Sequence, residues 1–279
     1  MAEAVMSPWQ KRWTALRYVV GENPLSLAAF LLFATFVLLA LVGPWLAPFD
    51  ALTSNVGTPL APPSLKYWFG TDALGRDILS RVVVAARLDL GIAVAAVSIS
   101  VLVGGLAGAC AGFFGGIVGR LSDTIMAFPL FVLAMGIVAA MGNTVANIVL
   151  ATAIINLPFY IRVARAESGV LRNTGFVEAA RLAGNSEARL LFYHIIPNIL
   201  PPMTVQVSLN MGWAILNAAG LSFIGLGVRP PAAEWGIMVA EGAQYIVSGE
   251  WWIALFPGAV LMLAVFCFNL LGDSLRDLV

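Results

Sequence analysis

Two aspartates in one polar stretch are the side chains of this sequence best placed for acid–base chemistry. Asp72 and Asp77 lie close together, with Arg76 between them. Neighbouring carboxyl groups can act as a general acid and a general base, so a hydrolytic site is one reading. The other is a tight turn, because the Gly-Thr-Asp and Gly-Arg-Asp steps combine glycine with short polar side chains that bond the backbone. We favour the turn and expect a structural motif made of Gly70, Thr71, Asp72, Gly75, Arg76 and Asp77.

A second polar stretch, residues 162–202, contains five arginines, three glutamates and the only histidine of the chain, His194. An intramembrane hydrolase would need a nucleophile and a base. His194 lies in this polar stretch rather than in an apolar one, and no Gly-x-Ser-x-Gly string occurs. We therefore rank an enzyme last among the possible functions and expect a non-catalytic chain.

Local spacing predicts the elements that position the second polar stretch. Residues 173–175 supply a turn and a cap, and residues 176–193 follow helical spacing. Gly184 should break or end this helix, because glycine commonly occupies the left-handed position just after one. Pro197 and the two prolines that follow it should prevent a smooth continuation into the next apolar run.

The predicted helix has an unusually small apolar face, built on alanines such as Ala179 and Ala180. A helix lying on the lipid interface would bury Trp, Phe or Leu over a wide face. A face of small residues instead permits close approach by another protein. Both readings are open on this evidence, and we favour the docking of a partner.

The composition places the whole chain in a membrane. Hydrophobic residues make up 60% of it and charged residues 11%, and the mean hydropathy is +0.92. The formal net charge is zero, so nothing indicates binding of nucleic acid. Cys110 and Cys267 lie inside apolar runs and are expected to be small buried hydrophobes rather than metal ligands or disulfide partners.

Six apolar runs have roughly the length needed to cross about 30 Å of hydrocarbon as helices. We expect an all-α polytopic membrane protein in which residues 1–23 form an N-terminal segment and residues 24–279 form a six-span domain. Small residues such as Gly104, Gly105 and Gly108 should serve helix packing. The runs are 25–41, 90–112, 124–141, 145–161, 203–226 and 251–271, and the longer polar connections are 48–88, 162–202 and 228–250.

The distribution of basic residues predicts the orientation. With residues 1–23 inside the cell, ten lysines and arginines lie on the cytoplasmic side and five lie outside. Both termini and residues 162–202 are then cytoplasmic, and residues 48–88 and 228–250 are external loops.

Two functional classes lose support from what the sequence lacks. A P-loop needs a lysine before Ser or Thr, but Lys11 precedes Arg12 and Lys66 precedes Tyr67, so the chain has no such site for nucleotide hydrolysis. An ion-coupled secondary transporter usually keeps Asp, Glu, His or Lys at membrane depth, and the six apolar runs contain none. That class remains the main rival, because backbone or Asn could coordinate an ion.

Glu178-Ala179-Ala180, followed by Gly184 and Pro197, resembles the cytoplasmic "EAA" signature of permease subunits in binding-protein-dependent ABC importers. His194 and Ile196 depart from the apolar residue and the leucine that the signature favours before its proline. The strings 69–88, 221–236 and 268–277 are similar to the dipeptide, oligopeptide and nickel branch of that family, and most of all to its second permease.

The resemblance implies that the helix couples the membrane spans to an ATP-hydrolysing subunit. It implies as partners a homologous permease subunit, two ABC ATPase subunits and an external substrate-binding protein, in the lipid bilayer of the bacterial inner membrane. No cofactor is expected in this chain, since ATP and Mg would be bound by the ATPases. The implied coupling residues are Glu178, Ala179, Ala180, Arg181, Gly184, Asn185 and Pro197.

The resemblance also implies half of a translocation pathway that opens alternately to the two sides of the membrane. Its substrates would be di- or oligopeptides. Nickel chelates, glutathione and opine-like compounds are alternatives within the same family, and no pocket residue distinguishes them.

Overall fold

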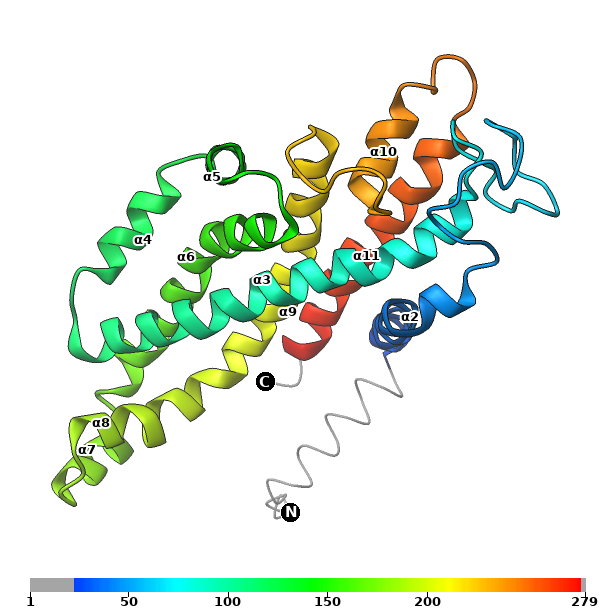
Figure 1. Ribbon diagram of the computed structural model, residues 1–279. Helices are drawn as coiled ribbons and strands as arrows, with labels where there is room; N and C mark the ends of the chain where they lie inside the picture. Colours follow the sequence, from blue (N-terminus) through cyan, green and yellow to red (C-terminus); the bar gives the residue numbers. More distant parts are fainter. Residues whose placement is uncertain (1–22, 277–279) are drawn as a thin grey trace, which may run out of the picture.

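The computed structural model describes residues 23–276, which are helical apart from their connecting loops (Figure 1). The predicted N-terminal segment lies outside the described residues except for Asn23. No strand forms between residues 23 and 276, where one isolated bridge pairs Thr71 with Asp77. The predicted all-α class is confirmed. The elements are α2 (Pro24–Leu46), α3 (Ile78–Phe114), α4 (Val118–Met126), α5 (Leu130–Met141), α6 (Val145–Leu171), α7 (Gly175–Leu182), α8 (Glu187–Arg189), the π-helical turn η2 (Leu190–Ile195), α9 (Ile196–Phe223), α10 (Trp235–Ala243) and α11 (Trp252–Arg276).

Four of these helices, α2, α3, α6 and α11, are each long and apolar enough to cross a membrane. The bent pair α4 and α5 passes the same test only when taken together, which makes at most five spans among the described residues. The 28-residue α9 is not among them, and Gln206, Asn210 and Asn217 interrupt its apolar sequence. The helices therefore support a multi-span membrane protein and account for four or five of the six predicted spans.

The run 124–141, which we predicted as one span, is not one continuous helix. α4 ends at Met126, α5 begins at Leu130, and the two are bent by 92°. Pro129 is the N-cap of α5. Proline lacks an amide hydrogen and disfavours helical backbone in the residue before it, so it separates the two helices.

α3 is the central helix of the bundle and packs most extensively on α6, with α2 and α9 also against it. Three glycines at four-residue spacing, Gly104, Gly108 and Gly112, face α6. A Cβ atom on any of them would come within 2.9 Å of a carbonyl oxygen of α6. Small residues let the two backbones approach this closely, as the sequence predicted for Gly104 and Gly108.

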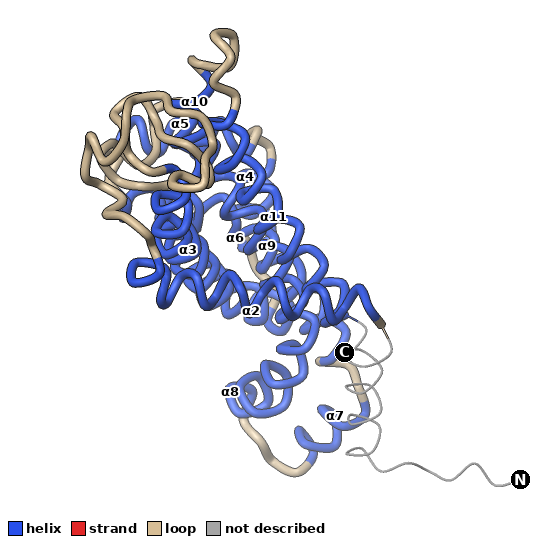
Figure 2. Tube along the Cα trace, turned by 90° about the vertical axis from the view of Figure 1, so that its right-hand side faces the viewer, coloured by secondary structure: helices blue, strands red, loops and turns tan. Residues whose placement is uncertain are grey.

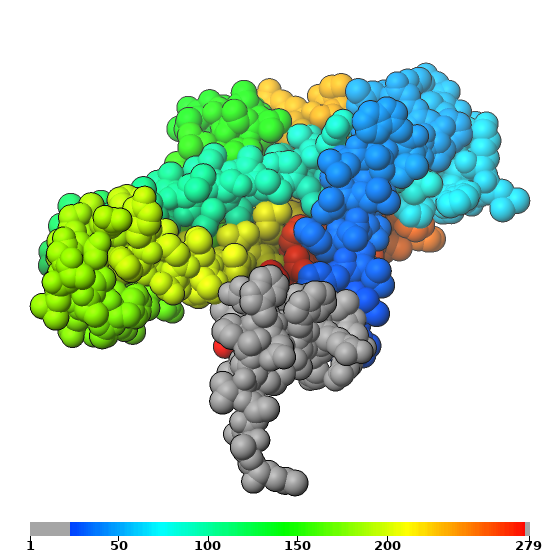
Figure 3. All heavy atoms as spheres, turned by 90° about the horizontal axis from the view of Figure 1, so that it is seen from below, coloured from blue at the N-terminus to red at the C-terminus, as the bar shows by residue number. Residues whose placement is uncertain are grey.

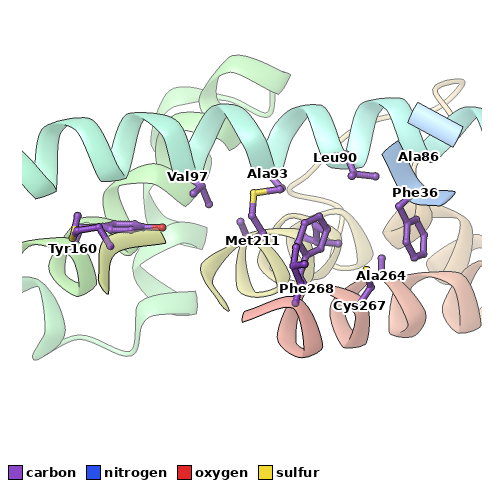
Figure 4. Close-up of a cluster of buried hydrophobic side chains, with 14 of the residues drawn as sticks. Phe36, Ala86, Leu90, Ala93, Val97, Tyr160, Met211, Ala264, Cys267 and Phe268 are labelled. Atoms are coloured by element: carbon purple, nitrogen blue, oxygen red, sulfur yellow. The ribbon is translucent and has the colours of Figure 1, made fainter. Parts of the chain in front are cut away.

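A cluster of buried apolar side chains joins α2, α3, α9 and α11 (Figure 4). Leu90 and Val97 of α3 lie in it together with Met211 of α9 and Phe268 of α11. Cys267 is fully buried in the same cluster and its thiol is free. It therefore packs as the small hydrophobe that its apolar neighbours in the sequence predicted.

The two polar stretches lie at opposite ends of an elongated molecule. Figure 2 shows α7 and α8 at one end, and α10 with the loop between α2 and α3 at the other. Figure 3 gives the same separation from a second direction. A bilayer between these ends would place the two stretches on opposite sides.

Three connections predicted as polar loops contain more helix than expected. α3 already begins at Ile78, inside the stretch 48–88, because Asp77 caps it there. α6 continues to Leu171, and α9 begins at Ile196, so both helices enter the stretch 162–202. The stretch 228–250 contains α10.

Pro197, Pro201 and Pro202 were predicted to prevent a smooth continuation into the next apolar run, and the π-helical turn η2 does lie directly before Pro197. The three prolines nevertheless do not end the helix, since all of them lie inside α9. Pro197 lies in the first turn, where an amide hydrogen has no partner within the helix. Side chains add two bonds in this region: Asn198 Nδ2 donates to the carbonyl of His194 at 2.6 Å, beside Pro197, and Thr204 Oγ1 donates to that of Pro201 at 2.6 Å.

Candidate functional site

The first candidate site is the segment from α7 to η2, at the end of the molecule remote from α10 (Figure 2). Val177 of α7 is fully buried in one apolar cluster with Leu190, Leu191 and Ile195 of η2. Glu178 lies in the first turn of α7 and Arg181 in the last, where the helix dipole favours each charge. α7 is therefore fixed to the bundle by one face.

Gly184 ends α7 as the sequence predicted. Its φ of +86° lies in the left-handed region, which glycine adopts without steric cost. The amide of Gly184 donates to the carbonyl of Arg181 at 3.0 Å, and that of Asn185 donates to the carbonyl of Ala180 at 3.3 Å. These two bonds form a Schellman motif, and Asn185 Nδ2 adds a third to Ala180 at 2.8 Å.

An ion pair closes the turn between α7 and α8. Arg181 Nε lies 3.0 Å from Glu187 Oε1, and Arg181 Nη2 lies 3.3 Å from Glu187 Oε2. The side chain of Ser186 accepts the amide of Arg189 at 3.4 Å and caps α8. Pro197 lies apart from this turn, in the first turn of α9 beyond η2.

The outer face of the same segment exposes apolar side chains. Leu182 is 90% exposed and Tyr193 is 73% exposed, and Phe176 and Phe192 are also exposed. Ala188, Arg189, Phe192 and Tyr193 line a shallow hollow. Large exposed apolar side chains beside charged ones, such as Phe192 and Tyr193 beside Arg189, are typical of a protein interaction surface.

The second candidate site is the stretch that contains Asp72 and Asp77, where a closed turn forms. Gly70 and Gly75 both have positive φ. Asp72 Oδ1 accepts the amides of Leu74 and Arg76, at 2.9 and 3.0 Å. Asp77 Oδ2 accepts the amide and the hydroxyl of Ser80, at 2.8 and 2.6 Å, and so caps α3. Thr71 Oγ1 donates to the carbonyl of Thr58 at 2.6 Å, which ties the turn to the preceding loop.

A buried charge network links this turn to α10. Arg76 Nε lies 2.6 Å from Asp72 Oδ2, and Arg76 Nη2 lies 3.2 Å from Glu241 Oε2. Arg81 approaches the same two carboxylates at 3.7 and 3.6 Å. The guanidinium groups of Arg76 and Arg81 thus balance the carboxylates of Asp72 and Glu241. Asp72 and Asp77 are also both held by hydrogen bonds within the turn. This geometry favours a structural role for the motif over acid–base catalysis.

A further pair of acidic side chains, which the sequence motifs did not indicate, is formed by Asp89 of α3 and Glu234 before α10. Trp235 donates its amide to Asp89 Oδ2 at 3.1 Å. Glu234 caps α10 by accepting the amides of Gly236 and Ile237 at 3.0 and 2.8 Å. Asp89 directly precedes the predicted run 90–112, so extending that helix by one residue would have revealed a carboxyl group inside a spanning helix.

Burial raises the pKa of the Glu234 carboxyl. The neighbouring Asp89 side chain, the amides of Ile237 and Gly236 and the side chain of Ser222 act in the opposite direction. Glu234 is fully buried, so loss of hydration is the larger effect.

The described part of the chain contains no group of three or more His, Cys, Asp or Glu side chains arranged to hold a metal ion. The charges of Arg76, Arg81, Asp72 and Glu241 are taken up by one another. The surfaces that remain available for function are therefore those that could contact other molecules, above all the exposed face from α7 to η2.

Two family models match parts of the chain. Residues 100–279 match the model of a family described as binding-protein-dependent transport system inner membrane component. Residues 7–63 match the N-terminal transmembrane domain of oligopeptide transport permease C.

Similar proteins align over nearly their whole length. A probable D,D-dipeptide transport system permease protein of Escherichia coli K12 is 41% identical over 267 residues, which cover 94% of this chain and 89% of the relative. A di/tripeptide transport system permease protein of Pseudomonas aeruginosa is 41% identical, with coverages of 97% and 91%. A glutathione transport system permease protein of Escherichia coli is 37% identical, with coverages of 99% and 91%.

Proposed function

The chain belongs to the family of inner membrane components of binding-protein-dependent transport systems, and on that premise we propose that it forms half of the pathway that carries di- or oligopeptides into the cell. It is a permease subunit of an ABC importer and not an enzyme. The observation that carries the substrate class is the 41% identity, over almost the full length, to permease proteins of dipeptide and di/tripeptide systems. Glutathione is the second candidate substrate, because a glutathione permease protein is 37% identical.

The partners we propose are a homologous permease subunit, two ABC ATPase subunits and an external substrate-binding protein. The absence of a P-loop from this sequence supports an energy source on another chain. ATP and Mg would then be held by the ATPases, and no cofactor is assigned to this chain.

The topology we propose has six spans with both termini in the cytoplasm. α9 supplies the span that hydropathy alone does not identify: its 28 residues extend for about 42 Å, more than the hydrocarbon thickness. Residues 162–202 are then cytoplasmic, and the loops before α3 and around α10 are external. The ten-to-five bias of basic residues supports this orientation.

The segment from α7 to η2 is the element we propose to contact an ATPase. Glu178, Ala179, Ala180 and Arg181 on α7, with Gly184 and Asn185 in the turn after it, would present a compact docking surface. Leu182, which is 90% exposed, gives that surface an apolar group to bury. Pro197 would act from the first turn of α9 rather than from the contact itself.

Packed side chains connect the proposed ATPase contact directly to a membrane-spanning helix. Val177 packs with Leu190, Leu191 and Ile195, and η2 leads directly into α9. A displacement of α7 by a closing ATPase would therefore act on α9 through packed side chains and continuous helix. Rocking of the spans between outward and inward openings is the alternating access we propose.

At the opposite end, we propose that Gly70, Thr71, Asp72, Gly75, Arg76 and Asp77 form a structural motif at the outer surface. The buried network from Asp72 and Arg76 to Glu241 supports this role, because it fixes the loop before α3 to α10.

The proposal is tested by reconstituting the chain with its partner subunits in vesicles and measuring uptake of labelled peptides. We expect ATP-dependent uptake of a dipeptide or oligopeptide that the binding protein retains. Equal amounts of glutathione, a nickel chelate and an opine would be compared in parallel. Transport of one of these three without any transport of peptides would contradict the peptide assignment.

A further inference from the structure

Asp89 and Glu234 bring two carboxyl groups together at a place that the proposed transport cycle does not use. Asp89 is 1% exposed and Glu234 is fully buried. Their oxygens accept the amides of three consecutive residues, Trp235, Gly236 and Ile237. The two carboxyl groups therefore lie side by side at the start of α10, although they are 145 positions apart in the sequence.

No cation compensates this pair among the described residues. The ion pairs of this part of the chain all involve other carboxylates. The packed helices α2 and α9 carry no charged residue. The remaining charged groups nearby are engaged or exposed: Arg81 lies between Asp72 and Glu241 of α10, Arg87 lies over the ring of Trp45, and Arg229 of the preceding loop is exposed.

The available donors suffice for one negative charge. Two amides at the start of α10 bond Glu234, the side chain of Ser222 acts on it in the same direction, and the helix N-terminus favours an anion there. Asp89 has one amide donor, and its Oδ1 is buried without a partner. An ionised oxygen left without a donor in a buried place is costly, whereas a protonated one becomes a donor that the neighbouring carboxylate can accept.

We propose that Asp89 and Glu234 form a single proton-binding site, in which the two carboxyl groups share one proton and one negative charge. The shared proton links α3 to the start of α10 and so holds the segment between α9 and α10 against the bundle. Trp235, fully buried beside the pair, donates its ring N–H to the carbonyl of Val82 at 3.0 Å and depends on this link for its position. Removal of the proton would leave two adjacent negative charges, which repel and loosen the junction.

The direction of the pH dependence follows from proton binding. The folded pair retains a proton that free carboxyl groups release above about pH 4. The contribution of this proton to stability is therefore greatest near pH 4 and falls as the pH rises from there to the titration point of the pair. In that range the equilibrium constant for unfolding should rise about tenfold per pH unit from this site alone.

The test uses infrared spectroscopy of the full chain, purified with its partner subunits, near neutral pH. We expect the wild-type spectrum to contain the carbonyl stretching band of a protonated carboxyl group. Asp89→Asn and Glu234→Gln should each remove an intensity equivalent to one group. The band should persist in Asp123→Asn, a matched control whose carboxylate is exposed.

Thermal unfolding over the same pH range gives an independent readout. In Asp89→Asn the amide of the new side chain donates a hydrogen bond at every pH. The stability of this variant should therefore not decline as the pH rises, unlike that of the wild type. A wild-type spectrum without the protonated band would overturn the proposal, whether or not the variants fold. So would a pH dependence of stability that is the same in the wild type and in Asp89→Asn.

Discussion

The guanidinium of Arg181 and the carboxylate of Glu187 meet in two parallel bonds, of 3.0 and 3.3 Å, across the turn that separates α7 from α8. Both side chains are about half exposed, at 45% and 52%. An ion pair so placed contributes little to overall stability, roughly 0.2–1 kcal/mol. Its consequence is geometric, because it joins the last turn of α7 to the first turn of α8.

Arg181→Gln should therefore lower substrate uptake more than it lowers stability. We expect a melting temperature close to that of the wild type and weaker retention of the ATPase during purification. Asp123→Asn is the matched control, since it breaks another exposed ion pair, with Arg162, away from α7. Equal uptake by Arg181→Gln and the control would show that the α7–α8 angle does not matter for coupling.

Gly184→Ala should destabilise the end of α7 by about 1 kcal/mol, because an L-residue is strained at a φ of +86°. No atom outside the local backbone lies within 4 Å of the added Cβ, so backbone strain is the only cause. Gly175→Ala is the control, since its Cβ also meets open space but its φ is not positive.

Gly184→Leu should reduce uptake further than Gly184→Ala, because the larger side chain projects from the proposed docking surface. Glu178→Lys should have a smaller effect, since it removes a favourable helix-dipole interaction of about 0.3–1 kcal/mol and a charge open to a partner. The measurements are uptake, membrane abundance and ATPase co-purification. Normal uptake by Gly184→Leu at wild-type abundance would leave a lipid-surface helix as the better description of α7.

Arg76→Gln should destabilise the protein by about 1.5–3 kcal/mol, because it removes the charged hydrogen bond to buried Asp72 and leaves Arg81, at 3.7 Å, as the nearest cation. Thermal unfolding of the purified chain in detergent measures the loss. Arg229→Gln, an exposed change in the loop before α10, should have little effect and serves as the control. Similar melting temperatures for both variants would mean that the network does not hold the loop to α10.

The proposed topology predicts which cysteines react with an impermeant thiol reagent in intact cells. In a background without Cys110 and Cys267, a cysteine at Ser64 or at Val247, which is 98% exposed, should be labelled. A cysteine at Ala183, in the exposed turn after α7, should react only after the membrane is opened. Ala233 is buried and is a poor position for such a probe. Labelling of the Ala183 position in intact cells, without labelling of the Ser64 and Val247 positions, would show that the orientation is the reverse of the one proposed.

The sequence by itself determined the features that depend on composition and on neighbouring residues. The apolar runs indicated membrane helices, and the local motifs indicated the family, which the full-length relatives confirm. Gly184 marked the end of α7 correctly, because a left-handed helix end is decided by the few residues around it.

Tertiary structure decided what depends on segments far apart in the chain. Pro197, Pro201 and Pro202 suggested a break, yet α9 continues through them, because packing and side-chain bonds stabilise a helix that local propensity opposes. No spacing rule relates Arg76 to Glu241 or Asp89 to Glu234, since periodicity describes only residues within a few turns. These charges meet because α10 packs against the start of α3, and that contact exists only once the bundle has formed.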